Sequence, residues 1–249
     1  MAAGLDHIGI VGPDLDALAG AVSALGFHLT PHVAHAGGRT GNRCVMLRDG
    51  GYLELMGIAP GQRSATLERF LARGPGGHIL ALSVADTAAA LARLRRAGFA
   101  VEEVTAADRD AADGRRARFS LVMPPDPPEG RAILIRHETP DLLWRPETPL
   151  HPHGAVSLLE AVFAADIPAA TAAFLSRVAG RPAEPDPAGG YRIPLVRGLI
   201  RILPRAAATV LYPAGGGPIV GLTLGTATGG GEIFHAGGVT IRLAAGGEP

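Results

Sequence analysis

Three residues with chemically versatile side chains stand in short apolar runs. His7 lies in LDHIGIV, His78 opens HILALSV, and Glu54 lies in YLELMGI. An imidazole can bind a metal ion or transfer a proton near neutral pH, and a carboxylate can serve either purpose. Each also has a structural explanation. A histidine on an apolar strand face commonly packs in the core, and Glu54 could lie exposed at a sheet edge, because an unpaired buried carboxylate is unfavourable.

The elements around His7 and Glu54 follow a simple order. Residues 5–11 are short and β-branched, which predicts a strand with His7 on the same face as Val11. Residues 14–25 have an Asp N-cap and helical apolar spacing, and Gly26 ends the helix. Residues 43–48 and 52–58 read as a hairpin. The unit is therefore a strand, a helix and two or three strands.

The same order recurs twice along the chain. Residues 78–84 predict an apolar strand and 86–99 a helix with an Asp cap and a closing Gly-Phe. A third copy has a strand at 155–163 and a helix at 167–179, ended by Gly180. Further strands are expected at 100–104, 116–122, 131–137, 191–196, 198–203, 218–226 and 238–243. The chain thus carries an internal repeat of βαβββ type.

The repeat predicts the domain organisation. Residues 1–140 are expected to form one domain of two βαβββ units. Residues 141–154 are rich in proline and read as a linker, and 155–249 as a third, degenerate unit. The predicted fold class is α+β, with curved mixed sheets around a cleft and the helices outside.

Composition excludes several classes of function. The chain has 249 residues, of which 47% are hydrophobic and 18% charged, as expected for a globular protein with a sizeable core. Lys plus Arg and Asp plus Glu both number 23, and aromatic residues make up 4%, so neither a nucleic acid nor an anionic membrane is the expected partner. The single cysteine, Cys44, excludes an intramolecular disulfide. Without a leader or a long apolar run, we expect a cytoplasmic protein that does not enter a membrane.

These motifs resemble those of a known superfamily. The strand starts LDHIGIV and GGHILALSV, the helices closed by Gly-Phe, and the stretch GGRTGNRCVMLRDGGYLELMG are similar to the vicinal oxygen chelate superfamily, and within it to bacterial glyoxalase-like domain proteins. The resemblance covers residues 5 to about 140 well and the third copy more loosely. It implies that paired βαβββ units form a cleft lined by inward side chains.

The resemblance also implies a set of metal ligands. Metal-binding members take one ligand from the first strand and one from the last strand of each unit. By position these are His7, Glu54 and His78. Two imidazoles and a carboxylate suit Zn²⁺, Fe²⁺, Mn²⁺, Ni²⁺ or Co²⁺ and would leave positions open for substrate.

The fourth ligand position departs from the family pattern. The matching residue in the last strand of the second unit is Leu134, which cannot bind a metal. Glu138 lies four residues further along, roughly 13 Å away in a strand, which is too far to replace it. His137 has the opposite strand parity from Leu134. A three-ligand centre and a vestigial site without metal both stay open.

The expected function is a divalent-metal-dependent enzyme of the lyase, isomerase or dioxygenase type. It would act on a small oxygen-rich substrate, with Glu54 as ligand or proton-transfer base. Arg136 could meet a substrate carboxylate, and Asn42 lies in the glycine-rich loop beside the hairpin. The alternative is a metal-free protein that binds or sequesters a small molecule. A homodimer is an open alternative to a monomer.

Overall fold

The computed structural model describes residues 3–35, 37–110, 114–145, 150–213 and 215–246. Its chain forms successive strand units. Unit 1 consists of β1 (Gly4–Val11), α1 (Leu15–Ala24), β2 (Val33–Ala34), β3 (Thr40–Met46) and β4 (Tyr52–Ile58). After helix α2 (Ala65–Leu71), unit 2 consists of β5 (Gly76–Ser83), α3 (Thr87–Arg96), β6 (Thr105–Asp110), β7 (Arg116–Val122) and β8 (Arg131–His137).

The C-terminal part repeats the arrangement. A 3₁₀ turn, η1 (Pro140–Leu142), leads toward unit 3, which consists of β9 (Ala155–Ala165), α4 (Pro168–Ala179), β10 (Glu184–Asp186), β11 (Gly190–Pro194) and β12 (Leu199–Pro204). Helix α5 (Arg205–Leu211) follows. Unit 4 consists of three strands without a helix between them, β13 (Ile219–Thr226), β14 (Ile233–Ala236) and β15 (Val239–Ala245).

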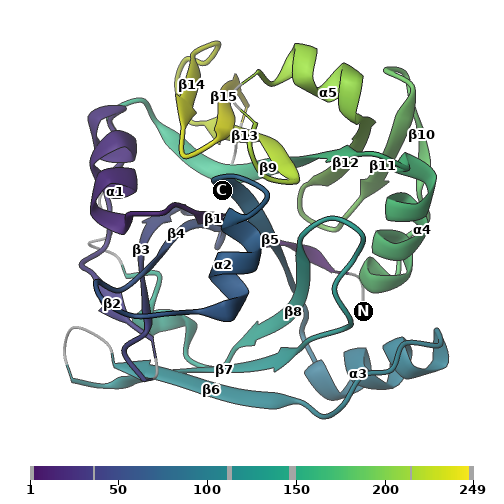
Figure 1. Ribbon diagram of the computed structural model, residues 1–249, viewed down its shortest axis with the longest axis horizontal. Helices are drawn as coiled ribbons and strands as arrows, with labels where there is room; N and C mark the ends of the chain where they lie inside the picture. The colour runs from purple at the N-terminus through teal and green to yellow at the C-terminus, as the bar shows by residue number, and fades with distance from the viewer. Residues whose placement is uncertain (1–2, 36, 111–113, 146–149, 214, 247–249) are drawn as a thin grey trace.

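The units associate in two pairs through their first strands. Strands β1 and β5 run antiparallel and join units 1 and 2, which we call the first pair. Strands β9 and β13 run antiparallel and join units 3 and 4, the second pair. Within each unit the first strand also pairs in parallel with the last, as β1 does with β4. A single pairing, Ile219 with Gly77, links the two pairs into one continuous sheet (Figure 1).

Local sequence accounts for the ends of the helices. Asp14 and Asp86 accept hydrogen bonds from the backbone N–H groups of residues 17 and 89 and so cap α1 and α3. Gly180 ends α4 in the left-handed conformation, which glycine adopts without a steric penalty. These signals are local, since each lies within one or two turns of the helix end that it fixes.

The sheet of the first pair has two chemically different faces. Its outer face, which includes Ile8, Leu55, Leu80 and Leu134, belongs to the largest core cluster together with residues of α1 and α3. Its inner face is covered by α2 and by the segment after β8. Side chains of this inner face include Tyr52, Met56, Val11, Ile79 and Ile133. In Figure 1, α2 lies over the middle of this sheet, whereas α1 and α3 lie at its margins.

The predicted α+β fold of repeated βαβββ units is confirmed, and the C-terminal organisation is richer than expected. The range 155–249 was expected to hold one degenerate unit, but it holds a complete unit 3 and the three-stranded unit 4. The sequence patterns also did not predict α2 and α5, because both are only seven residues long.

The expected linker at 141–154 is in part tightly packed, although its residues 146–149 lie outside the described ranges. His151 is buried, accepts a hydrogen bond from the backbone N–H of His28 and donates one to the carbonyl of Met46. His153 packs edge-on against Phe27. The ring of His153 also lies 5.6 Å from that of Phe234 on β14, so this segment contacts unit 1 and unit 4. Within the described residues, no helix has the length and apolar character needed to cross a membrane.

Candidate active site

The structure brings His7 and Glu54 together on the inner face of the first pair. Their strands, β1 and β4, are parallel neighbours, and Glu54 pairs with Gly9, two residues after His7. Nε2 of His7 lies 3.6 Å from Oε2 of Glu54. The ring of Tyr52 stacks on the imidazole with centroids 4.3 Å apart, so the orientation of His7 is held by packing.

A β-bulge adds Asp6 to the same site. The pairing of β1 with β5 shifts between Leu5 and His7, which leaves Asp6 as the extra residue. Its carboxylate lies 2.7 Å from Nδ1 of His7 and 3.1 Å from Nε2 of His137. Burial alone would raise the pKa of Asp6, but hydrogen bonds from His137 and His7 outweigh burial and lower this pKa to about 2. An ionised Asp6 only accepts hydrogen bonds, so Nδ1 of His7 donates and Nε2 is directed toward Glu54.

Glu54 is an ionised carboxylate held from several sides. Asn42 donates a hydrogen bond from Nδ2 to Oε1, and Nε2 of His35 lies 3.8 Å from the same oxygen. Burial would raise the pKa of Glu54, but the neighbouring His35 and His7, with a contribution from the charge of Arg109, lower it to about 2. Such a carboxylate is a weak base at neutral pH and a strong electrostatic partner for a cation.

His78 lies elsewhere on the first pair. It stands at a second irregularity of the β1–β5 pairing, and its fully buried ring stacks on Phe70 of α2 with centroids 5.0 Å apart. Its Nε2 donates a hydrogen bond to the carbonyl of Gly74, 2.8 Å away. Burial lowers the pKa of His78. These contacts join β5 to α2, and the structure does not bring His78 to His7 and Glu54.

The helix caps show why the two histidines are not equivalent. Asp14 and Asp86, the N-caps of α1 and α3, are 72 positions apart, and the same offset relates the Gly-Phe pairs that follow these helices. It places Ile79 at the position of His7 and His78 at the position of Asp6. A shift of one residue in a strand reverses the face of every side chain. The histidine repeat in the sequence is therefore out of register by one residue.

The last strands of units 1 and 2 show the same one-residue difference between the register expected from the sequence and the register in the structure. Glu54 pairs with Gly9, and its counterpart in unit 2, the residue that pairs with Ala81, is Ile133. Leu134, expected at the fourth ligand position, instead lies in the core on the outer face. Glu138 accepts a hydrogen bond from Ser120. Unit 2 thus places isoleucines where unit 1 has His7 and Glu54.

The donors on this face do not fit the expected metal centre. Nowhere in the described ranges do three or more His, Cys, Asp or Glu side chains form a group that could hold a metal ion. The separation of His7 and Glu54 would suit two ligands of one ion, but Ile79 and Ile133 occupy the positions from which unit 2 would contribute. We therefore derive the chemistry of the site from the side chains of this chain alone.

Of the two residues expected to bind substrate, only Asn42 lies beside His7 and Glu54. Asn42 is at the site and orients Glu54. Arg136 is half-exposed and faces Glu138 at 3.4 Å, away from His7. Sequence reasoning missed the roles of Asp6, His35 and His137. Regular strand alternation would place Asp6 on the face opposite His7, so no sequence pattern pointed to it. His137 was discounted because its parity was compared with Leu134 rather than Ile133.

Comparison with known proteins identifies the family. The model of the glyoxalase-like domain family matches residues 5–179. The chain belongs to this family. The resemblance to the vicinal oxygen chelate superfamily predicted from the motifs is therefore confirmed. No curated protein matches the chain.

Solved structures of the same fold agree. A hypothetical protein from Staphylococcus aureus is 13% identical, with a TM-score of 0.74 over 98% of this chain and 99% of that one. A variant of 4-hydroxymandelate synthase from Streptomyces coelicolor is 13% identical, with a TM-score of 0.58 over 91% of this chain and 72% of that one. Methylmalonyl-CoA epimerase from Mycobacterium tuberculosis is 27% identical, with a TM-score of 0.42 over 53% of this chain and 86% of that one. At these levels the first two similarities establish the fold of the glyoxalase-like chain.

Proposed function

We propose that this glyoxalase-like protein is an enzyme that transfers a proton on a small oxygen-bearing molecule, with His7 as the proton acceptor. The observation that carries the proposal is the position of the His7 ring between two ionised carboxylates, Asp6 at Nδ1 and Glu54 opposite Nε2. A histidine oriented by a buried carboxylate presents its second nitrogen as a base, and the imidazolium that forms is stabilised by the negative charge beside it.

The proposed step is the removal of a proton from carbon next to a carbonyl group. The C–H bond breaks, the proton moves to Nε2 of His7, and the electron pair moves to the carbonyl oxygen as an enolate. Return of the proton to the same or another atom regenerates His7. Isomerisation, epimerisation and elimination share this first step, so the proposal names a reaction class rather than a product.

Isotope exchange tests the proposal whatever the product of the reaction is. The protein is incubated in D₂O with a panel of small 2-oxo acids, 2-hydroxy ketones and thioesters, and loss of the proton next to the carbonyl is followed by NMR. His7→Gln should reduce the exchange rate by about 10²- to 10⁴-fold. His235→Gln is the matched control, because His235 is exposed on β14. Equal exchange rates in wild type and His7→Gln would contradict the proposal.

Binding without turnover is the second candidate function. It is favoured by the low exposure of the polar groups, because Asn42 is 1% and His7 5% exposed. Proton transfer requires a substrate carbon to reach Nε2 of His7, whereas binding beside the ring does not. A compound of the panel that binds in a saturable way and shows no proton exchange in the wild type would support this candidate over the enzyme.

A further inference from the structure

Arg109 is a cation on the inner face that no carboxylate of the described residues neutralises directly. It comes from β6 and lies with its guanidinium 5.1 Å from the ring centre of Phe119. Burial and the Glu54 carboxylate raise the pKa of Cys44 to about 12, and the charge of Arg109 opposes them. The Glu54 carboxylate contributes to the raised pKa of Arg109, although among the described residues no carboxylate forms an ion pair with it within 4.0 Å. Arg109 is partly buried, and a partly desolvated cation without an ion pair can bind an anionic partner from outside the chain.

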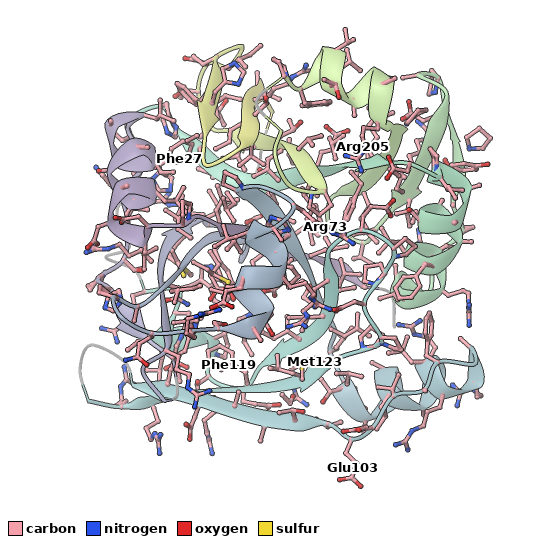
Figure 2. The ribbon with its side chains drawn as sticks, viewed as in Figure 1. Phe27, Arg73, Glu103, Phe119, Met123 and Arg205 are labelled. Carbon is pink, nitrogen blue, oxygen red and sulfur yellow. The ribbon has the colours of Figure 1, made fainter. Side chains whose placement is uncertain are left out.

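Aromatic rings border the same region. His137 makes edge contacts with Phe119 at 5.3 Å, with Trp144 at 4.8 Å and with Tyr52 at 6.2 Å between ring centres. Figure 2 shows Phe119 below α2, beside the ribbon of β7. Leu143 packs against this group. The cation is thus next to flat apolar surface, which favours a planar ligand over a flexible chain.

Two polar atoms among these rings lack partners. Nε2 of His137 bonds to Asp6, whereas Nδ1 is buried with no hydrogen-bond partner among the described residues. The indole nitrogen of Trp144 is buried and unpaired in the same way. Unpaired buried groups are rare because they forgo the hydrogen bonds they make in water. An oxygen that accepts from Trp144 would supply one missing bond, and a hydroxyl could also donate to His137.

We propose that Arg109 selects the substrate of this site, and that the substrate class is a small planar carboxylic acid. Its carboxylate pairs with the Arg109 guanidinium through two parallel hydrogen bonds, and its planar body lies against Phe119, Tyr52 and Trp144. The inference rests on the proposed function, because it places this acid beside His7. It adds the charge and shape of the molecule, which the acid–base proposal leaves open.

The intrinsic fluorescence of Trp144 provides a direct test, since it is the only tryptophan of the chain. Benzoate and cinnamate serve as planar acids. The comparison compounds are benzamide, a neutral planar analogue, cyclohexanecarboxylate, a non-planar acid, and acetate, a carboxylate without a ring. Benzoate or cinnamate should quench or shift the emission in a saturable way. Benzamide, cyclohexanecarboxylate and acetate should each bind at least about 10-fold more weakly. Saturation-transfer NMR of the ligands detects any binding that leaves the fluorescence unchanged.

Two arginine variants make the test specific. Arg109→Gln should weaken binding of the planar acids by about 10- to 100-fold and leave benzamide unaffected. Arg118→Gln is the matched control, because Arg118 is exposed on the adjacent strand β7, and it should bind as the wild type does.

The binding test also separates this inference from the proposed function. His7→Gln should retain binding of the planar acids while it loses proton exchange, so failure of the exchange test leaves the ligand class standing. Equal binding of benzoate by wild type and Arg109→Gln, equal binding of benzoate and benzamide, or no binding by either method would overturn the proposal.

Discussion

Equivalent positions on the inner faces of the two pairs carry different charged or titratable side chains. His7 lies eight residues before the start of α1, and Glu160 lies eight residues before the start of α4. Glu54 pairs with Gly9 two residues after His7, and Arg201 pairs with Val162 two residues after Glu160. The first pair therefore has histidine and glutamate where the second pair has glutamate and arginine.

The second pair satisfies its charges internally. Arg201 donates two hydrogen bonds to Asp186, at 2.8 and 2.9 Å, and Thr223 donates one to Glu160 at 2.8 Å. Residues of α5 and the ring of Tyr212 fill the rest of this face with a compact apolar cluster. In the first pair, by contrast, Arg109 forms no ion pair with a described carboxylate, and His137 and Trp144 keep buried nitrogens without partners among the described residues. The second pair is not free of such groups, because Nε of Arg242, which lies over the Tyr212 ring, is also buried without a hydrogen-bond partner. The two faces differ in that the second pair binds its Arg201 and Glu160 side chains with its own residues, whereas the first pair leaves Arg109 without an ion pair among the described residues.

The largest expected effect separates the two buried aspartates. Asp6→Asn should reduce proton exchange by about 10²- to 10⁴-fold, because an amide no longer holds His7 in the required tautomer. Asp186→Asn should leave exchange unchanged and lower the free energy of unfolding by about 1–3 kcal/mol, because it breaks the pair with Arg201. Exchange rates and urea unfolding of both variants check the contrast. It fails if Asp186→Asn loses exchange as severely as Asp6→Asn.

A second experiment gives unit 2 the ligands that it lacks. Ile79→His with Ile133→Glu should create, together with His7 and Glu54, a four-ligand centre of the family type. Affinity for Zn²⁺ or Co²⁺ should rise at least about 100-fold over wild type, measured by competition with a chelating dye and by the visible spectrum of Co²⁺.

The control for the metal experiment is Leu134→Glu. Leu134 is fully buried on the outer face, so this change should destabilise the fold and add no metal affinity. Binding of Co²⁺ by the wild type as tightly as by the double variant would show that the natural chain already completes a centre, contrary to the register assigned to unit 2.

Much of the fold could be predicted because its signals are local. The caps at Asp14 and Asp86 and the apolar strands at 5–11 and 155–163 determine where elements begin, and the structure agrees within a few residues. Unit 4 was not recognised because the strand–helix order that marked the other units is absent from it: β13 is followed by strands rather than a helix.

The site was harder to predict because it depends on strand register. His7, Glu54 and Asn42 were identified by their motifs, and the structure brings them together. Asp6 enters the site only through a bulge, which periodicity cannot reveal. His78 and Leu134 were chosen by matching apolar runs, and an error of one residue moves a side chain to the other face. The helix caps would have given the correct register.

Acid should destabilise the first pair in particular. The folded-state pKa of Glu54 and of Asp6 is about 2, below the ordinary values of 4.5 and 3.8, so folding releases protons from these carboxyls. Their contribution to stability is present above about pH 5 and is lost as the pH falls toward 2. It is on the order of 3 kcal/mol for Glu54 and 2 kcal/mol for Asp6. Urea unfolding between pH 7 and pH 3 measures this loss.

Variants of these carboxyls test the source of the acid sensitivity. Glu54→Gln should be less stable than wild type at pH 7 and should lose less stability on acidification, because its group does not titrate. Asp166→Asn is the control, since Asp166 is exposed and pairs with Arg205 at the surface. The assignment is refuted if Glu54→Gln and wild type lose stability in parallel between pH 5 and pH 3.

The smallest expected effect concerns how the two pairs are joined. Helix α3 has its own cap in Asp86, whereas Ile167 at the start of α4 offers no side-chain cap. Glu129, from the β7–β8 turn of the first pair, holds this end of α4 by accepting hydrogen bonds from the hydroxyl of Thr171 and from the backbone N–H of Asp166, just before the helix. Glu129→Ala should therefore lower the free energy of unfolding by about 1–2 kcal/mol, with Thr171 left unpaired in the core. Asp86→Ala should cost about 1 kcal/mol, because water can replace an exposed cap. A Glu129→Ala protein as stable as wild type in urea would mean that the contact of Glu129 with α4 does not contribute to joining the two pairs, and that other contacts, such as the hydrogen bonds of Arg93 to the carbonyls of Arg177 and Val178, suffice.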